Sequence, residues 1–169
     1  EPDLITCAKG LTSGYLPMGA VVASPRIAEP FWKPGAGLFR HGYTYSGHAT
    51  AAVAALANLA IMEREDLPGR ALDLERRLAD ALAPFESHPM VAEVRRGAGV
   101  LAAVQFHADA IAADPSLPAR AASTSRANGV ISRALAPGAL QVSPALILDD
   151  GGIDELVNGL GATLDALAR

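Results

Sequence analysis

Lys9 is the residue whose type and position most directly suggest chemistry. It follows a short apolar run, Leu4–Ala8, and opens a loop that contains Gly14 and Pro17. Of the fourteen basic residues only Lys9 and Lys33 are lysines, so this position holds an amine in a chain that otherwise uses arginine. Burial favours the neutral amine, which is the species that attacks carbonyl groups and forms Schiff bases. Two readings of this position stay open: a buried, reactive amine, and a solvated lysine at a strand end.

A second candidate is the polar and aromatic loop His41–His48 (HGYTYSGH), which directly precedes an alanine-rich helical run. The free N–H groups of a helix N-terminus, together with the hydroxyls of Thr44 and Ser46, form the kind of site that binds phosphate. The same hydroxyls would also serve as ordinary helix caps. His41 and His48 suggest a metal pair, but the sequence places no third ligand beside them, so we expect no metal site.

Arg133, in the run VISRALAPG, is the third candidate. It follows an expected short strand at 130–131 and precedes a loop. A guanidinium binds a carboxylate through two parallel hydrogen bonds, so this position suits a carboxylate ligand. A surface arginine without a ligand is the alternative reading of the same residue.

The apolar periodicity predicts the elements that position these residues. Helices alternate with short strands, which indicates an α/β fold. Strands are expected at 4–8, 19–23, 91–94, 100–106, 130–131 and 140–142, and helices at 26–32, 48–65, 70–85, 118–128 and 153–167.

Three local features complete this expectation. The run Leu67–Gly69 is the clearest boundary, so we expect one domain at residues 1–67 and another at 68–169. The two N-terminal strands are expected to be buried, and the helix at 48–65 to pack closely against a flat surface, because alanine has little bulk. Gly129 is expected to stop one helix and Asp150 to cap the last one.

Composition limits the classes of partner. The formal net charge is −4 and the only adjacent basic pair is Arg95-Arg96, so we expect neither nucleic acid nor an anionic membrane as a partner. The single cysteine, Cys7, excludes an internal disulfide and a cysteine-based zinc site. The apolar stretches are shorter than a membrane span. We therefore expect a cytoplasmic protein.

Three runs of the sequence, PDLITCAKGLTSGYLPMGAVV, HGYTYSGH and GVISRAL, resemble the class III pyridoxal-phosphate-dependent aminotransferases in order and spacing. The reading TYSGH favours the omega-transaminase branch, with its amine:pyruvate and β-alanine:pyruvate enzymes, because other branches more often read TFxGNP. The resemblance implies the C-terminal part of a fold-type I transferase. Residues 1–67 would end the large cofactor-binding domain and 68–169 would form the small α/β domain. Because the chain opens at Glu1 without a methionine, we expect a front half outside it.

The resemblance also implies roles for single residues. Lys9 would form the Schiff base with pyridoxal 5'-phosphate and then carry a proton. Thr44, with the backbone at Tyr43, would bind the cofactor's phosphate across the interface of a homodimer with shared active sites. Arg133 would take the carboxylate of the keto acid or amino acid, and would move aside for an uncharged amine. The implied reaction transfers an amino group between an amine or ω-amino acid and a keto acid such as pyruvate.

The sequence departs from the family pattern in places. Ala49 replaces a usual proline, and the run 135–138 replaces a usual Cys-Gly. The family's aspartate for the pyridinium nitrogen, its stacking aromatic residue and its Ser-Gly turn cannot be placed on this chain. These departures leave two alternatives open. One is a catalytically incomplete structural or oligomerisation module, and the other is a different class III activity, a decarboxylase or an aminomutase.

Overall fold

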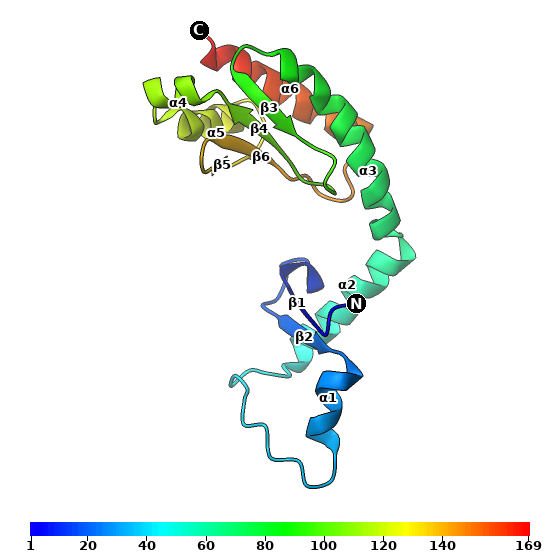
Figure 1. Ribbon diagram of the computed structural model, residues 1–169. Coiled ribbons are helices and arrows are strands. Elements are labelled where there is room, and N and C mark those ends of the chain that lie inside the picture. The colour runs from blue at the N-terminus through cyan, green and yellow to red at the C-terminus, as the bar shows by residue number, and fades with distance from the viewer. The chain divides into compact units, whose positions relative to one another are not determined.

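The computed structural model describes residues 1–169, which divide into two compact units, Glu1–Asp66 and Leu67–Arg169. Both helices and strands are present in each unit (Figure 1), so the predicted α/β class is confirmed. Identifying these units with the two domains of a transferase stays a prediction. None of the helices combines the length and the apolar character needed to cross a membrane.

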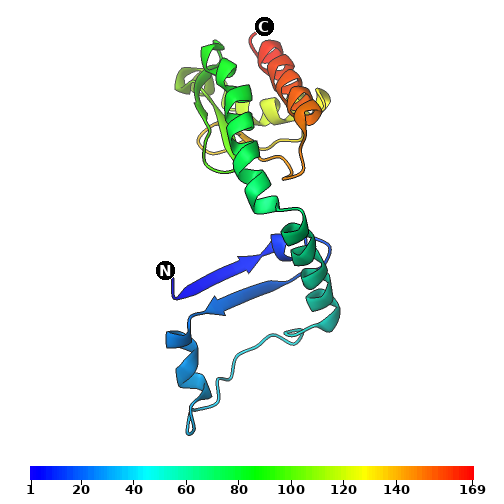
Figure 2. The same ribbon diagram turned by 90° about the vertical axis from the view of Figure 1, so that its right-hand side faces the viewer.

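The N-terminal unit is built on a β-hairpin. Its two strands pair antiparallel from Leu4 opposite Ala23 to Ala8 opposite Gly19, and they lie side by side in Figure 2. Both strands have the predicted bounds. The elements of this unit are β1 (Leu4–Ala8), the 3-10 turn η1 (Lys9–Leu11), β2 (Gly19–Ala23), α1 (Pro25–Trp32) and α2 (Ala49–Arg64).

The prediction that these two strands are buried is wrong for this chain. The side chains of Leu4, Ile5, Val21 and Val22 are all more than half exposed. The physical reason is that a sheet of only two strands has two open faces, and no other element of the unit covers them.

Apolar side chains lie on every side of helix α2, and Asn58 is the one polar residue between Ala51 and Met62. Ala51 and Ala55 are buried, as close packing of small side chains predicts, but Val53 and Leu56 are 65% and 67% exposed. A helix that is apolar on every side is typical of the interior of a larger assembly.

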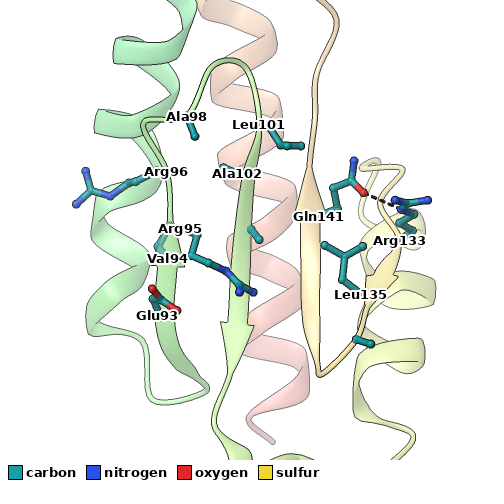
Figure 3. A pocket seen from close by; sticks show the side chains of 12 residues that line it. Glu93, Val94, Arg95, Arg96, Ala98, Leu101, Ala102, Arg133, Leu135 and Gln141 are labelled. Atoms are coloured by element: carbon teal, nitrogen blue, oxygen red, sulfur yellow. Dashed lines mark hydrogen bonds between the residues drawn. The ribbon is translucent and has the colours of Figure 1, made fainter. Parts of the chain in front are cut away.

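The C-terminal unit is a sheet covered by helices on one face. The four strands are antiparallel in the order β3-β4-β6-β5, and Figure 3 shows the helices behind the sheet. The elements are α3 (Leu67–Leu82), the 3-10 segment η2 (Ala83–Ser87), β3 (Val91–Arg95), β4 (Ala102–Phe106), α4 (Ala108–Ala113), α5 (Leu117–Ala127), β5 (Ala134–Leu135), β6 (Ala139–Val142) and α6 (Asp150–Leu167).

The core of this unit lies between the sheet and its helices. Alternate strand residues face the helices, as the period of two in a strand requires. Most of the fully covered members lie in α3, in the strands β4 and β6, and in α6. They include Leu78, Leu82, Val104, Phe106, Leu140, Leu160 and Leu164.

The strand predicted at 130–131 is wrong, because pairing begins only at Ala134. Val130 is instead used to close helix α5: its N–H donates to Ser125 O at 2.9 Å, and its carbonyl accepts from Ser125 Oγ at 2.8 Å. These bonds leave Val130 unavailable to a neighbouring strand. Gly129, with φ of +85°, ends α5 as predicted.

The predicted cap of the last helix is off by one residue. Asp149, not Asp150, is the N-cap, and its Oδ1 accepts from Gly152 N at 2.9 Å. The short helix α4 was not predicted from the sequence, because its six residues are too few to show a clear apolar period.

Candidate active site

Lys9 lies where β1 ends and the turn η1 begins. Its side chain is exposed, so of the two readings the solvated lysine at a strand end describes this chain. The hairpin that carries it is itself uncovered, and no ion pair or hydrogen bond involves the ammonium group. Its backbone φ of +47° lies in the left-handed region, which costs a residue with a side chain about 1–3 kcal/mol. Such a conformation persists only where the surroundings impose it.

The turn after Lys9 is held by its own backbone. Lys9 O accepts from the N–H groups of Thr12 and Gly14, both at 3.3 Å. The Thr12 side chain is buried and donates to Leu16 O at 2.5 Å. Ser13, like Lys9, has a positive φ, of +49°. The turn therefore contains two strained positions bridged by local hydrogen bonds.

Asn58, in helix α2, fixes this turn from outside. Its Nδ2 donates to Gly10 O at 2.8 Å and to Leu11 O at 3.1 Å, and its Oδ1 accepts from Ser13 Oγ at 2.6 Å. Sequence reasoning missed this residue. The available signal was a lone amide side chain within an alanine-rich helix.

The loop predicted to bind phosphate forms a turn just before α2. Ser46 Oγ accepts from Tyr43 N at 2.9 Å, and Ser46 N donates to Tyr43 O at the same distance. The prediction that Ser46 or Thr44 caps the helix is wrong. His48 is the cap, because its Nδ1 accepts from Ala51 N at 3.3 Å. The Thr44 side chain is exposed.

Both histidines considered as a metal pair have other partners. His48 caps α2, and the His41 ring lies between Phe39 and Tyr43 with ring centroids 5.8 and 5.7 Å apart.

A cavity of about 310 Å³ lies at the N-terminus of α2. Tyr43 lines it, while Lys9 and Thr44 do not. Helix α2 is nevertheless the shared support of both loops, since its first turn follows the loop 41–48 and its Asn58 holds the Lys9 turn. The other lining residues come from the end of the Lys9 loop, the start of β2, the loop 41–48 and α2: Pro17, Met18, Gly19, Tyr45, Ser46, Gly47, His48, Ala51 and Ala52.

Arg133 lies in the C-terminal unit, directly before β5. Its Nε donates to Gln141 Oε1 at 2.7 Å, drawn as a dashed line in Figure 3, and the side chain is exposed. The residue lines a cavity of about 670 Å³ on the sheet face that the helices leave open. Its guanidinium thus keeps donors free for an anion.

The run 135–138, which departs from the family pattern, is a tight connection between β5 and β6. Gly138 N donates to Leu135 O at 2.8 Å. Gly138 has φ of +132°, and a Cβ there would come within 2.2 Å of Ile111 Cδ1, so only glycine fits. This connection fixes Arg133 at the sheet edge opposite Gln141.

Comparison with known proteins gives one family. Residues 1–164 match the model "Aminotransferase class-III". The chain is 39% identical over 183 residues to a diaminobutyrate–2-oxoglutarate transaminase of Halomonas elongata, covering 100% of this chain and 39% of the relative. It is 36% identical over 179 residues to a putrescine–pyruvate aminotransferase of Pseudomonas aeruginosa, covering 99% and 37%. The chain therefore spans about two-fifths of the length of these curated relatives.

Solved structures agree with this. An (S)-enantioselective omega-transaminase from Thermomicrobium roseum superposes with a TM-score of 0.90 at 34% identity, covering 100% of this chain and 38% of that one. An amine transaminase from an uncultivated Pseudomonas species, in a PLP-bound form, gives 0.88 at 38% identity, covering 98% and 39%. The two units are thus similar to part of a fold-type I transferase.

Proposed function

The chain belongs to the class III aminotransferase family, and on that premise we propose that the whole protein is an omega-transaminase. It moves an amino group between an amine or ω-amino acid and a keto acid such as pyruvate. Lys9 is the residue that binds pyridoxal 5'-phosphate through a Schiff base. The observation that carries this assignment is an exposed primary amine in a strained turn that Asn58 holds from α2.

The donor groups near α2 fit such a cofactor. The Lys9 amine suits an aldehyde, and the exposed Thr44 hydroxyl beside a helix N-terminus suits a phosphate. The Tyr43 N–H donates to Ser46 Oγ in this structure, so it would reach a phosphate only after that bond opens. When bound, the cofactor supplies an electron sink for the carbon next to the reacting amine.

The residues of the chain supply position and proton transfer. The turn holds the backbone of Lys9 at the end of β1. With its Nζ free, Lys9 would be able to accept the proton of the substrate carbon that bears the amino group. An arginine there would stay protonated and could do neither task.

Arg133 takes the carboxylate of the acid substrate. Its Nε remains bonded to Gln141, which leaves the two terminal nitrogens of the guanidinium for a bidentate pair with a carboxylate. When an uncharged amine binds instead, Arg133 would turn aside.

We also propose a homodimer with shared active sites, in which Thr44 reaches the site of the partner subunit. The exposure of the loop 41–48 supports this, since Tyr43 and Tyr45 are 80% and 81% exposed. Cys7, a free thiol, suits the reducing cytoplasm.

A second candidate is a structural or oligomerisation module without catalysis. The exposed apolar side chains of α2 and of the hairpin favour association with another surface. This candidate needs no amine chemistry at Lys9.

One experiment separates these functions. The whole protein is mixed with pyridoxal 5'-phosphate, reduced with borohydride and digested, and the modified lysine is located by mass spectrometry. We expect the label on Lys9 and not on Lys33, and we expect alanine to form from pyruvate when an amine is supplied. No label with an intact fold would favour the structural module. Release of carbon dioxide from a supplied amino acid, without formation of alanine, would favour a decarboxylase.

A further inference from the structure

One row of side chains crosses β3, β4 and β6 of the C-terminal sheet and ends at Arg133, directly before β5. Arg95 pairs with Ala103, Ala103 pairs with Gln141, and Gln141 N donates to Arg133 O at 3.1 Å. Residues directly opposite in antiparallel strands point to the same face. The row therefore places Arg95 and Arg133 on the sheet face that carries no helix (Figure 3).

Each of these two arginines is held by a neutral amide. Arg95 Nη2 donates to Gln105 Oε1 at 2.9 Å, and Arg133 Nε donates to Gln141 Oε1 at 2.7 Å. The glutamines are fixed in turn, since Gln105 Nε2 donates to Gly138 O at 2.7 Å. Amides orient a guanidinium without neutralising it, so both positive charges stay available to an anion.

The other charged residues of this cavity do not cancel that charge. Arg96 turns to the helix side of the sheet, where it pairs with Glu86 at 2.9 Å and donates to Ala79 O at 3.2 Å. Glu93 is the one acidic residue that lines the cavity, and no ion pair joins it to Arg95. The lining thus has an excess of positive charge.

The cavity has room for a small ligand between the two arginines. Its volume is about 670 Å³, within the range of small-molecule sites, and Ala103 leaves space at the centre of the row. Neighbouring strands lie about 4.8 Å apart, so the Cα atoms of Arg95 and Arg133 are roughly 14 Å apart. In Figure 3 the Arg95 side chain extends over β4, where its Nη2 donates to Gln105 Oε1, so the guanidinium lies nearer to β6 than the Arg95 Cα does.

We propose that Arg95 is a specificity-determining residue that binds the second carboxylate of a dicarboxylic keto acid. Arg133 takes one carboxylate, Arg95 takes the other, and the chain of four or five carbons lies over Ala103. This inference rests on the proposed function, because it assumes that Arg133 binds the acid substrate. A monocarboxylic acid such as pyruvate would use Arg133 alone.

The test compares a dicarboxylic with a monocarboxylic acceptor in the whole protein. In Arg95→Gln we expect KM for 2-oxoglutarate to rise at least about 10-fold, because a charge-assisted bond to carboxylate is lost, while KM for pyruvate changes less than about twofold. Arg96→Gln is the matched control, since its guanidinium is already paired with Glu86. It should leave both values unchanged. Arg95→Lys keeps the charge and should restore part of the preference.

A binding measurement gives the same comparison without turnover. Glutarate has two carboxylates and no keto group, so its calorimetric affinity should fall at least about 10-fold in Arg95→Gln and stay constant in Arg96→Gln. Equal changes for both acceptors, equal effects of the two arginine variants, or glutarate binding that ignores Arg95 would overturn the inference. If the unaltered protein transferred no amino group to either acceptor, the proposed function would be wrong. The glutarate measurement would still decide whether Arg95 binds a carboxylate.

Discussion

The C-terminal unit buries a continuous apolar cluster between sheet and helices, whereas in the N-terminal unit only Thr12, Ala51 and Ala55 are buried. The proposed chemistry is distributed the other way, since Lys9 and Thr44 both lie in the less buried unit. The comparison teaches that different interactions stabilise the two parts: apolar packing stabilises the C-terminal unit, whereas the turn that carries Lys9 lies outside that packing. The Lys9 turn is held by hydrogen bonds from Asn58 rather than by a core.

The largest expected effect comes from a substitution that abolishes amino transfer and leaves the fold unchanged. Lys9→Arg keeps the charge and the exposed position but cannot form a Schiff base. We expect the rate of amino transfer by the whole protein to fall roughly 10³-fold or more, with unchanged thermal unfolding. Steady-state kinetics and calorimetric melting measure the two properties.

Lys33→Arg is the control for that prediction. Lys33 is the other lysine, and its ammonium lies 3.6 Å from Glu29 in an exposed pair that an arginine can replace. A similar loss of activity in both variants would show that Lys9 has no special role.

The next largest effect is on stability, and it compares leucine substitutions in the buried core of the C-terminal unit and on the exposed surface of α2. Leu78 is 2% exposed in the C-terminal core, and Leu56 is 67% exposed on α2. We expect Leu78→Ala to lower the free energy of unfolding of its unit by about 2–5 kcal/mol, and Leu56→Ala to change that of the N-terminal unit by less than about 0.5 kcal/mol. Hydrogen exchange with mass spectrometry resolves the two units in the 169-residue chain.

The same exchange experiment tests whether the N-terminal unit is stable without another surface. We expect its amides to exchange much faster than those of the C-terminal unit in the isolated, monomeric chain. Equal protection in both units, or a comparable cost of the two leucine substitutions, would contradict this contrast.

The sequence was a good guide to elements that depend on local pattern. The two strands around the Lys9 loop and the helices with clear apolar periods were predicted within a few residues, because periodicity and breakers are local signals. The strand at 130–131 was wrong because its polar backbone groups bond to Ser125. The predicted cap of α2 was wrong because His48, an uncommon capping residue, takes that role.

The candidate site was harder to predict, because it depends on contacts between distant residues. Burial of Lys9 could not be judged without knowing that its hairpin has no cover. Asn58 reaches its partners across 45 to 48 positions of sequence. Arg95 stood out only as half of a basic pair, and its alignment with Arg133 needs the register of β3, β4 and β6.

A smaller effect concerns the support of the Lys9 turn. Asn58→Ala removes the hydrogen bonds to Gly10 O, Leu11 O and Ser13 Oγ, so we expect the local stability of the turn to fall by about 1–3 kcal/mol. Faster exchange of the Thr12 and Gly14 amides measures this. Slower labelling of Lys9 by pyridoxal 5'-phosphate should accompany it.

Asn128→Ala is the matched control for Asn58. Asn128 also donates from its amide to two acceptors, Thr124 O at 3.1 Å and Thr163 Oγ1 at 3.2 Å, but it lies in the C-terminal unit. It should destabilise that unit without changing the labelling of Lys9. If both variants slowed labelling equally, the effect would be general stability and not position.

The smallest effect compares one exposed carboxylate from each unit. The guanidinium of Arg26 and the Ser24 hydroxyl lower the pKa of Asp3 below its ordinary 3.8, and the Ser116 hydroxyl lowers that of Asp114. A lowered pKa in the folded state means that stabilisation is complete above about pH 4. It is lost as the pH falls through the folded-state value.

The two causes respond differently to salt. Asp3 depends first on a charged partner, so about 1 M salt, with a screening length of about 3 Å, should bring its pKa back towards 3.8. Asp114 depends first on a neutral hydroxyl, so its pKa should change less. Carboxyl-carbon NMR titrations measure both groups. Arg26→Gln should raise the pKa of Asp3, and Ser116→Ala should raise that of Asp114. An equal response to salt would mean that Arg26 is not the main cause at Asp3, and the ion pair would then contribute little to holding α1 against the hairpin.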